Sequence, residues 1–361
     1  MTPERFIHSV DAANLGAALN EALEQSNALV VICSRHSAKS EWVDKEIARF
    51  RELHGDDRIF SIIVSDPPPA CFPPDLLQDA NGNPLEPIAA DARPGFDGRG
   101  DALLKIIAGQ ARRQFENYLR LAESLLSRDP DNAAYQTEIA YAHMNLGTLE
   151  LRVNRFTAAE GHYRKTESIH RDIIKASPND LGPKEDLADT SSWLGEIASL
   201  SCDINAALSW FSQEYELRTL LVSLSNDMNQ LGHLANTAIL LGQRELLAGQ
   251  INLADQHFNE AFRIARRLVE HDEENARWKR LNAISGISMS QIAAVNGELP
   301  AAIEHIDAAS VKTHEISNIE AFQVSERYVL MLRGLAQKAR VLRLSGDART
   351  HDVVKEALAS G

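Results

Sequence analysis

The larger, C-terminal part of the sequence repeats itself with a period of 47 or 48 residues. A period of this length, kept over four consecutive units, indicates a repeat array in which each unit packs on its neighbours. Five columns of similar residues define the repeat: Asn132, Asp180, Asp227 and Asn275; Ala140, Ala188, Ala235 and Ala283; Gly147, Gly195, Gly242 and Ser290; Ala159, Ala207, Ala254 and Ala302; and Tyr163, Phe211, Phe258 and Ile306.

Each column has a physical interpretation in a pair of antiparallel helices. The Asn or Asp that opens a unit can cap the N-terminus of a helix. The three columns of small residues let neighbouring helices approach closely, and the aromatic or Ile column fills the space that they leave. We therefore expect units starting near residues 132, 180, 227 and 275 to share one core. A partial fifth unit is expected from about residue 322 to residue 358, with Ala339 and Gly346 in register.

The inner columns resemble the tetratricopeptide (TPR) pattern L-G followed by A-x-x-x-F. The fourth unit fits this pattern less well, and the period exceeds the usual one by about 14 residues, which longer helices would absorb. The resemblance implies an all-α, TPR-like superhelix over residues 111–361 that binds a protein or peptide in its groove. The matching residues are Leu146-Gly147 with Ala159 and Tyr163, Leu194-Gly195 with Ala207 and Phe211, Leu241-Gly242 with Ala254 and Phe258, and Met289-Ser290 with Ala302 and Ile306.

Residues 1–110 follow a different pattern, in which helices and strands alternate. Strands are expected at residues 29–33, at 59–64 and near 85–89, with amphipathic helices before and between them. This alternation predicts a parallel α/β sheet. Because residues 28–33 are uniformly apolar, we expect the first strand to be covered on both faces.

The segment 28–50, ALVVICSRHSAKSEWVDKEIARF, resembles the strand-C and helix-C segment of Toll/interleukin-1 receptor (TIR) domains. The resemblance extends over residues 14–109, with features of a bacterial branch of that family. A complete TIR domain has five parallel strands in the order B-A-C-D-E, and only C, D and E have counterparts here. The resemblance therefore implies an N-terminally incomplete, flavodoxin-like TIR sheet, either because the true start lies upstream or because the gene is truncated. Strand C would become an edge, which favours TIR–TIR self-association.

Enzymatic TIR domains cleave the nicotinamide–ribose bond of NAD⁺, and the resemblance assigns the catalytic carboxylate to Glu46. It also implies that Trp42 and Ser34 contact NAD⁺, which would be a substrate and not a bound cofactor. Trp42 and Glu46 are four residues apart, so they share one helical face. The residues alone allow another interpretation, in which Glu46 pairs with Arg49 and Trp42 is ordinary packing. In complete TIR domains the segments that have no counterpart here also contribute to the nucleotide pocket. Because catalysis needs its groups positioned together, their absence argues against activity of Glu46 alone.

Composition limits the other possibilities. A net charge of −14 argues against a nucleic-acid interface, which needs a basic face. The longest unbroken apolar run has six residues, whereas a membrane helix needs about 20. The three cysteines are far apart and the 12 histidines lack metal-site spacing, so neither a disulfide framework nor a metal site is expected. A cytoplasmic location fits best.

Two functions remain open from the sequence. The first is a TIR–TPR signalling scaffold that acts through protein–protein interaction, for example in bacterial stress or phage-defence signalling. The second is an NAD⁺ hydrolase that uses Glu46 and is regulated by the repeats.

Overall fold

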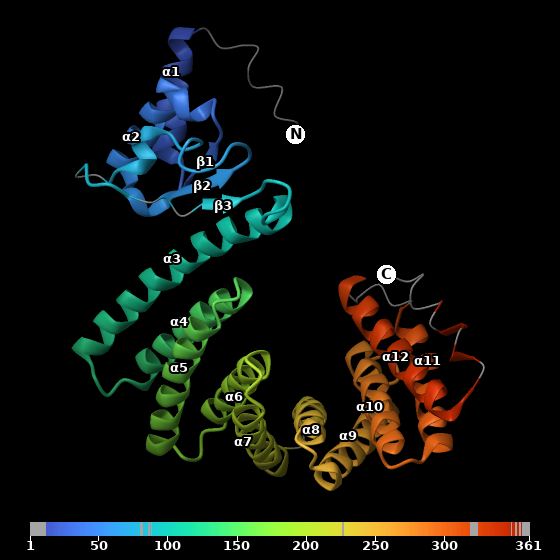
Figure 1. Ribbon diagram of the computed structural model, residues 1–361. Helices are drawn as coiled ribbons and strands as arrows, with labels where there is room; N and C mark the ends of the chain where they lie inside the picture. The colour runs from blue at the N-terminus through green and yellow to red at the C-terminus, as the bar shows by residue number, and fades with distance from the viewer. Residues whose placement is uncertain are drawn as a thin grey trace. The chain divides into compact units, whose positions relative to one another are not determined.

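The computed structural model describes residues 12–79, 82–85, 87, 89–225, 227–317, 324–347, 349–350, 352–353 and 355. The chain divides into two compact units (Figure 1). The first comprises Met1–Asp131 with Asn145–Arg155, and the second comprises Asn132–Met144 with Phe156–Gly361. The first holds a small parallel sheet with helices and the second is helical, which confirms the predicted α/β and all-α fold classes.

The sheet of the first unit has three parallel strands in the order β1-β2-β3. Within the described residues β1 has a single neighbour, as expected for an edge strand. The third strand was predicted near residues 85–89 but lies at Ala89–Asp91, and the Leu85 N–H instead donates to the Leu77 carbonyl in the preceding loop, 2.8 Å away. The elements are α1 (Ala12–Gln25), β1 (Leu29–Cys33), α2 (Glu41–His54), β2 (Ile59–Ile63), β3 (Ala89–Asp91) and α3 (Gly98–Arg128), with short 3₁₀ turns at Ser37–Lys39, Asp56–Arg58 and Pro74–Leu77.

The two faces of this sheet are covered unequally. On one face, Val31 and Cys33 pack with α2 and with the loop after β2. On the other face, α3 packs against β2 and β3. Val30 and Ile32, which alternate with the buried pair, therefore remain 47% and 60% exposed. The prediction that the first strand is covered on both faces is wrong, because the helix on that side lies over its neighbours.

The second unit consists of helices that pack in consecutive pairs, α6 with α7, α8 with α9 and α10 with α11. Helix α10, the first helix of its repeat unit, also contacts α8 and α12, the first helices of the repeat units before and after it. Helix α4 (Ala133–Arg152) belongs to the second unit up to Met144 and to the first unit from Asn145 on. The other helices of the second unit are α5 (Phe156–Ala176), α6 (Gly182–Leu200), α7 (Ile204–Leu224), α8 (Met228–Leu247), α9 (Ile251–His271), α10 (Ala276–Val295), α11 (Leu299–Ser317) and α12 (Val324–Ser345).

The packing columns are buried in the way the sequence predicts. In each of the four repeat units the residue of the aromatic or Ile column is fully buried, and so are the residues of both Ala columns. A methyl group added at Gly242 would lie 2.7 Å from the Phe258 ring, and one added at Gly195 would lie 3.0 Å from the Phe211 ring. The small residue is therefore required by the ring that packs against it.

The helix ends follow the repeat as well. The carboxylate of Asp227 accepts a hydrogen bond from an N–H of α8, and the side chain of Asn275 does the same for α10. The turn between the two helices of each repeat unit contains a residue of positive φ. Successive residues of this kind are 48, 47, 48 and 49 positions apart, so the repeat extends into a fifth repeat unit. They are Asn154 (60°), Cys202 (59°), Gly249 (77°), Gly297 (81°) and Gly346 (69°).

Candidate functional site

The loop between β1 and α2 is closed by its own serines. The Ser34 N–H donates to the Ser37 hydroxyl at 2.7 Å, and the Ser37 N–H donates to the Ser34 hydroxyl at 3.2 Å. The hydroxyl of Ser40 caps α2 by accepting from the Val43 N–H at 3.4 Å. These bonds fix the entry of α2 and engage Ser34 locally, with its hydroxyl directed to Ser37.

Glu46 lies in the second turn of α2 and is half-buried. It makes no hydrogen bond or ion pair with a described residue, and burial raises the pKa of its carboxyl above the ordinary value. Arg49, the alternative partner considered from the sequence, instead bonds Glu24 at 3.2 Å and Glu52 at 3.3 Å. The alternative in which Glu46 pairs with Arg49 is therefore wrong, because Glu52 and Glu24, the latter from α1, bind the same guanidinium.

Trp42 is 65% exposed, and the Lys45 ammonium lies 5.7 Å from the centroid of its ring. The interpretation of Trp42 as ordinary packing is wrong, since most of the ring faces solvent. An exposed indole one turn before Glu46 offers a flat apolar surface on the same side of α2. Helix α2 thus presents an aromatic ring and a partly desolvated carboxyl, whereas Ser34 belongs to the preceding loop.

A network of charges that the sequence reasoning missed joins the carboxyl ends of the strands. Arg35, just after β1, pairs with Asp66 at 3.1 Å, and Arg93 bonds the carboxylate of Asp91 at the end of β3. The Arg93 guanidinium also donates to the Asp66 carbonyl at 3.2 Å. Hydrogen bonds lower the pKa of both carboxyls, chiefly from the Arg35 N–H for Asp66 and from the Arg93 side chain for Asp91.

This edge is where open parallel sheets bind their ligands. The signal was present in the sequence, because Asp66 and Asp91 both fall within three residues of a strand end. Each of these carboxylates is paired with an arginine, so the network ties the three strand ends together.

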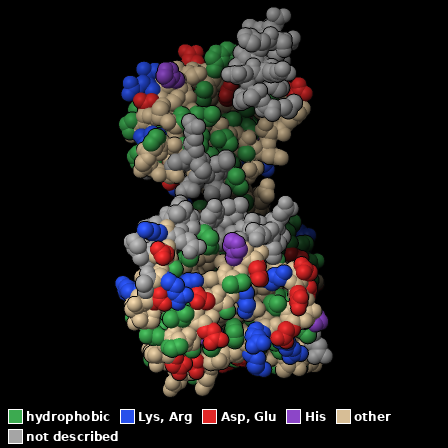
Figure 2. Space-filling view, turned by 90° about the vertical axis from the view of Figure 1, so that its right-hand side faces the viewer, with side chains coloured by type: hydrophobic (Ala, Val, Ile, Leu, Met, Phe, Trp, Pro, Cys, Tyr) green, Lys and Arg blue, Asp and Glu red, His purple; other side chains and the backbone are tan. Residues whose placement is uncertain are grey.

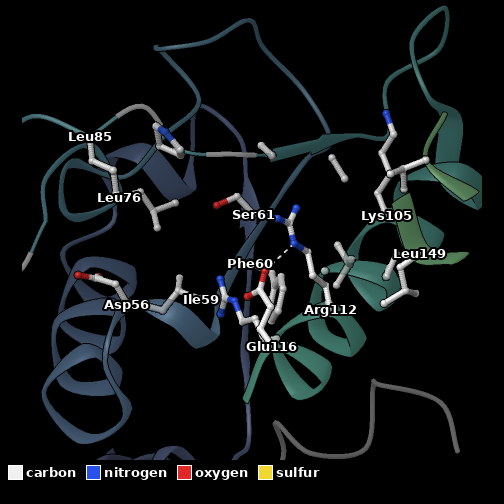
Figure 3. Close-up of a pocket in the computed structure, with 18 of the residues that line it drawn as sticks. Asp56, Ile59, Phe60, Ser61, Leu76, Leu85, Lys105, Arg112, Glu116 and Leu149 are labelled. Atoms are coloured by element: carbon white, nitrogen blue, oxygen red, sulfur yellow. Dashed lines mark hydrogen bonds and ion pairs between the residues drawn. The ribbon is translucent and has the colours of Figure 1, made fainter. Parts of the chain in front are cut away.

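A cavity of about 700 Å³ lies at the opposite edge, beside the start of β2 and β3 and along α3 (Figure 3). Its polar wall centres on Arg112, which bonds Glu116 at 2.8 Å and the buried carboxylate of Glu150 at 2.9 Å. Volumes of this size are typical of small-molecule sites. The lining includes none of Ser34, Trp42 and Glu46, so the structure does not bring the residues predicted from the sequence to this cavity.

Two further findings concern the described part of the chain. It contains no group of three or more His, Cys, Asp or Glu side chains that could hold a metal ion. None of its helices combines the length and the apolar character needed to cross a bilayer.

The fold and the α2 segment define a TIR-like domain followed by TPR-like helical repeats. Residues 3–67 match the family described as Thoeris protein ThsB, TIR-like domain. The matched range includes β1, α2 and β2, and with them Ser34, Trp42 and Glu46. The repeat region lies outside that range.

Solved structures resemble the chain at low sequence identity. BtubC (BKLC) from P. vanneervenii superposes with a TM-score of 0.53 and 14% identity, over 70% of this chain and 90% of that one. The apo form of RapI gives a TM-score of 0.48 with 10% identity, over 74% and 67% of the two chains. Aspartyl phosphate phosphatase F from Bacillus subtilis gives 0.47 with 13% identity, over 98% and 75%. No curated protein sequence matches the chain.

Proposed function

We propose that this protein is a signalling scaffold that acts through protein–protein interaction. Its TIR-like domain would associate with a second copy, and its repeat region would bind a protein or peptide. The observation that carries this proposal is the union of a TIR-like sheet that has an open edge with a TPR-like repeat array. The match to a Thoeris TIR-like family supports a setting in bacterial stress or phage-defence signalling.

Self-association is supported by the exposed side of β1. This strand has one neighbour within the described residues, and its side chains Val30 and Ile32 face solvent. An apolar edge strand with free backbone groups favours pairing with another chain. Pairing of two β1 edges would extend the sheet and place the side chains of a second β1 strand beside Val30 and Ile32 on the same face.

The mass of the full chain in solution tests this part of the proposal. Light scattering across a concentration series should show a dimer or larger assembly for the natural sequence. Ile32→Lys should shift the mass to the monomer, whereas Leu121→Lys, at an equally exposed leucine of α3, should not. A monomer at every concentration, or an assembly that Ile32→Lys leaves unchanged, would contradict self-association through β1.

The second candidate function is hydrolysis of the nicotinamide–ribose bond of NAD⁺, with water as the acceptor and nicotinamide and ADP-ribose as products. This function is favoured by the environment of Glu46, because its carboxyl is half-buried and forms no ion pair with a described residue. A negative charge at this place would stabilise a cationic, oxocarbenium-like transition state. The exposed ring of Trp42 would supply a surface for the nucleotide.

Nicotinamide release from NAD⁺ measures this activity directly. Glu46→Gln should lower the rate by about 100-fold or more, as expected when a group that stabilises transition-state charge is lost. Glu41→Gln, at an exposed glutamate of the same helix, should retain the rate. Absence of release by the natural sequence would exclude this function under the conditions used, and equal rates for both variants would exclude the role of Glu46.

A further inference from the structure

The cavity along α3 is formed by the first compact unit alone. Its lining comes from the end of α2, from β2 and β3, from α3, and from residues 149–155 at the end of α4, which belong to this unit. Its volume of about 700 Å³ lies in the range of small-molecule sites. Because Trp42 and Glu46 do not line it, a ligand held here would occupy a separate place on the domain.

Large apolar side chains form one part of the lining. Phe60 of β2 and Leu149 of α4 are half-buried, and Leu85 is exposed. The guanidinium carbon of Arg113 lies 4.7 Å from the centroid of the Phe60 ring, which is within the range of a cation–π contact and fixes the ring against α3. Since covering partly exposed apolar surface is favourable, these side chains favour a ligand with an apolar or aromatic body.

Cationic side chains form the other part of the lining. Five of the described lining residues are cationic and three are anionic, whereas the whole chain carries a net charge of −14. On the face of the repeat region seen in Figure 2, by contrast, acidic and basic side chains are intermixed. The excess of positive charge is therefore a local feature of the cavity. The five cationic residues are Arg51, Lys105, Arg112, Arg113 and Arg155.

Two exposed cations of the lining are each held by a carboxylate that is more buried. The side chain of Arg155 is 53% exposed and lies 3.5 Å from the carboxylate of Glu150, whose side chain is 3% exposed. The exposed ammonium of Lys105 bonds the half-buried carboxylate of Asp97 at 2.5 Å. Lysine has three N–H donors and arginine has five, so one ion pair leaves donors on both side chains for a ligand.

The three carboxylates of the lining are already engaged by arginines. Asp56 bonds Arg51, whose guanidinium also donates to the Asp75 carbonyl at 2.6 Å. Arg112 bonds the carboxylates of Glu116 at 2.8 Å and Glu150 at 2.9 Å, and Figure 3 shows the first of these bonds in the middle of the lining. None of these carboxylates would therefore oppose an entering anion as an uncompensated charge.

We infer that this cavity binds a small organic anion, with an apolar or aromatic body against Phe60 and Leu149 and a carboxylate or phosphate group on the cationic side chains. Ammonium and guanidinium groups bind the oxygens of both head groups. Lys105 and Arg155 have spare donors, so we expect them to contribute most to this binding. The inference goes beyond the proposed scaffold function, because it gives the first unit a ligand of its own.

Calorimetric titration of the full chain at constant ionic strength tests the site. The probes 1-naphthyl phosphate and 1-naphthoate combine an aromatic body with an anionic head, whereas 1-naphthalenemethanol lacks the charge and inorganic phosphate lacks the aromatic body. We expect saturable binding of at least one naphthyl anion, with the neutral and the inorganic probe weaker by at least about tenfold. Binding of only one naphthyl anion would identify the preferred head group. Absence of binding by both, or equal affinity for either comparison probe, would overturn the inference.

Charge variants assign the binding to this cavity. The double variant Lys105→Gln with Arg155→Gln removes both exposed cations and should weaken binding by at least about tenfold. The matched control is Arg128→Gln, at an exposed arginine at the end of α3 that does not line the cavity, and it should bind like the natural sequence. Equal affinity of the double variant and this control would overturn the inference.

A variant that fills the cavity gives an independent readout. Ala108→Trp keeps every charge and places an indole in the cavity from α3, so it should also weaken binding by at least about tenfold. Circular dichroism checks that each variant is folded, and the double variant changes only exposed side chains. Unchanged binding by folded Ala108→Trp would overturn the inference. Self-association of the same samples, measured by light scattering, reports on the scaffold proposal separately.

Discussion

Alanine at position 242 would place a methyl group where the Phe258 ring already lies. Its Cβ would be 2.7 Å from Cε1 and 2.8 Å from Cδ1 of that ring, whereas carbon atoms in contact are ordinarily about 3.5–4.0 Å apart. The ring is fully buried and cannot swing into solvent. Overpacking of this kind costs about 1–3 kcal/mol.

Two opposing effects determine the net change. Glycine inside a helix is less favourable than alanine by about 0.5–1 kcal/mol, so the substitution also removes a penalty. We expect Gly242→Ala to lower the free energy of unfolding by about 1–2 kcal/mol. The matched control is Gly161→Ala, at an exposed position inside α5 where an added Cβ meets nothing within 4 Å. That variant should raise the free energy of unfolding by about 0.5–1 kcal/mol.

Urea unfolding followed by helical circular dichroism measures both changes, with the slope compared between variants because repeat arrays can depart from two-state behaviour. Adding Phe258→Leu to Gly242→Ala relieves the clash, so the pair should show a favourable coupling of about 1–2 kcal/mol. Equal stabilisation by Gly242→Ala and Gly161→Ala would refute the steric account. Absence of coupling with Phe258→Leu would refute it independently.

Three further predictions concern single side chains. Burial lowers the pKa of His170 to about 4, and neither ring nitrogen has a hydrogen-bond partner. The folded state is therefore fully stable with respect to this residue above the unfolded pKa near 6.5, and it loses stability as the pH falls from 6.5 toward 4. The expected loss of unfolding free energy is about 3 kcal/mol. The difference between the urea midpoints at pH 7.5 and pH 4.5 should therefore be smaller for His170→Leu than for the natural sequence. Cys202→Gly should raise the free energy of unfolding by about 1 kcal/mol, and with it the urea midpoint, since glycine adopts the φ of 59° found at Cys202 without strain; a lower midpoint would contradict this. Burial raises the pKa of Cys33 to about 12 while Cys202 is exposed, so a thiol reagent should label Cys202 in the native protein and Cys33 only after unfolding, as peptide mass spectrometry would show.

The repeat region could be predicted in detail because its packing is governed by short-range sterics. A small residue and the ring that fills its space lie 16 positions apart, on two helices of one unit, as at Gly242 and Phe258. The same constraint recurs in each unit, so the columns are visible in one sequence. The first strand was predicted with its observed bounds for a related reason, since its uniform apolar run ends where the polar loop begins.

Features that depend on distant partners could not be predicted. Which carboxylate pairs with Arg49 is decided by Glu24, which α1 brings near, and not by spacing along α2. The exposure of Ile32 depends on where α3 crosses the sheet. The position of β3 depends on the loop before it, whose backbone bonds are local and leave no periodic signal.

The candidate site was predicted in part. The match over residues 3–67 supports the TIR-like assignment of the segment that carries Glu46, and the catalytic role of that residue stays a prediction. The charged network at the carboxyl ends of the strands could not be predicted, because its partners follow three different strands and only the sheet brings them together.

The residues of positive φ in the turns bear on how such an array changes length during evolution. Recombination between two equivalent turns, for instance between Cys202 and Gly249, would remove or duplicate 47 residues and cut no helix. The new junction would join backbone segments of the same handedness, so the chain would still reverse direction at that point. Repeat number can therefore vary in whole units, and a gene encoding one more or one fewer pair of helices would still specify a continuous core.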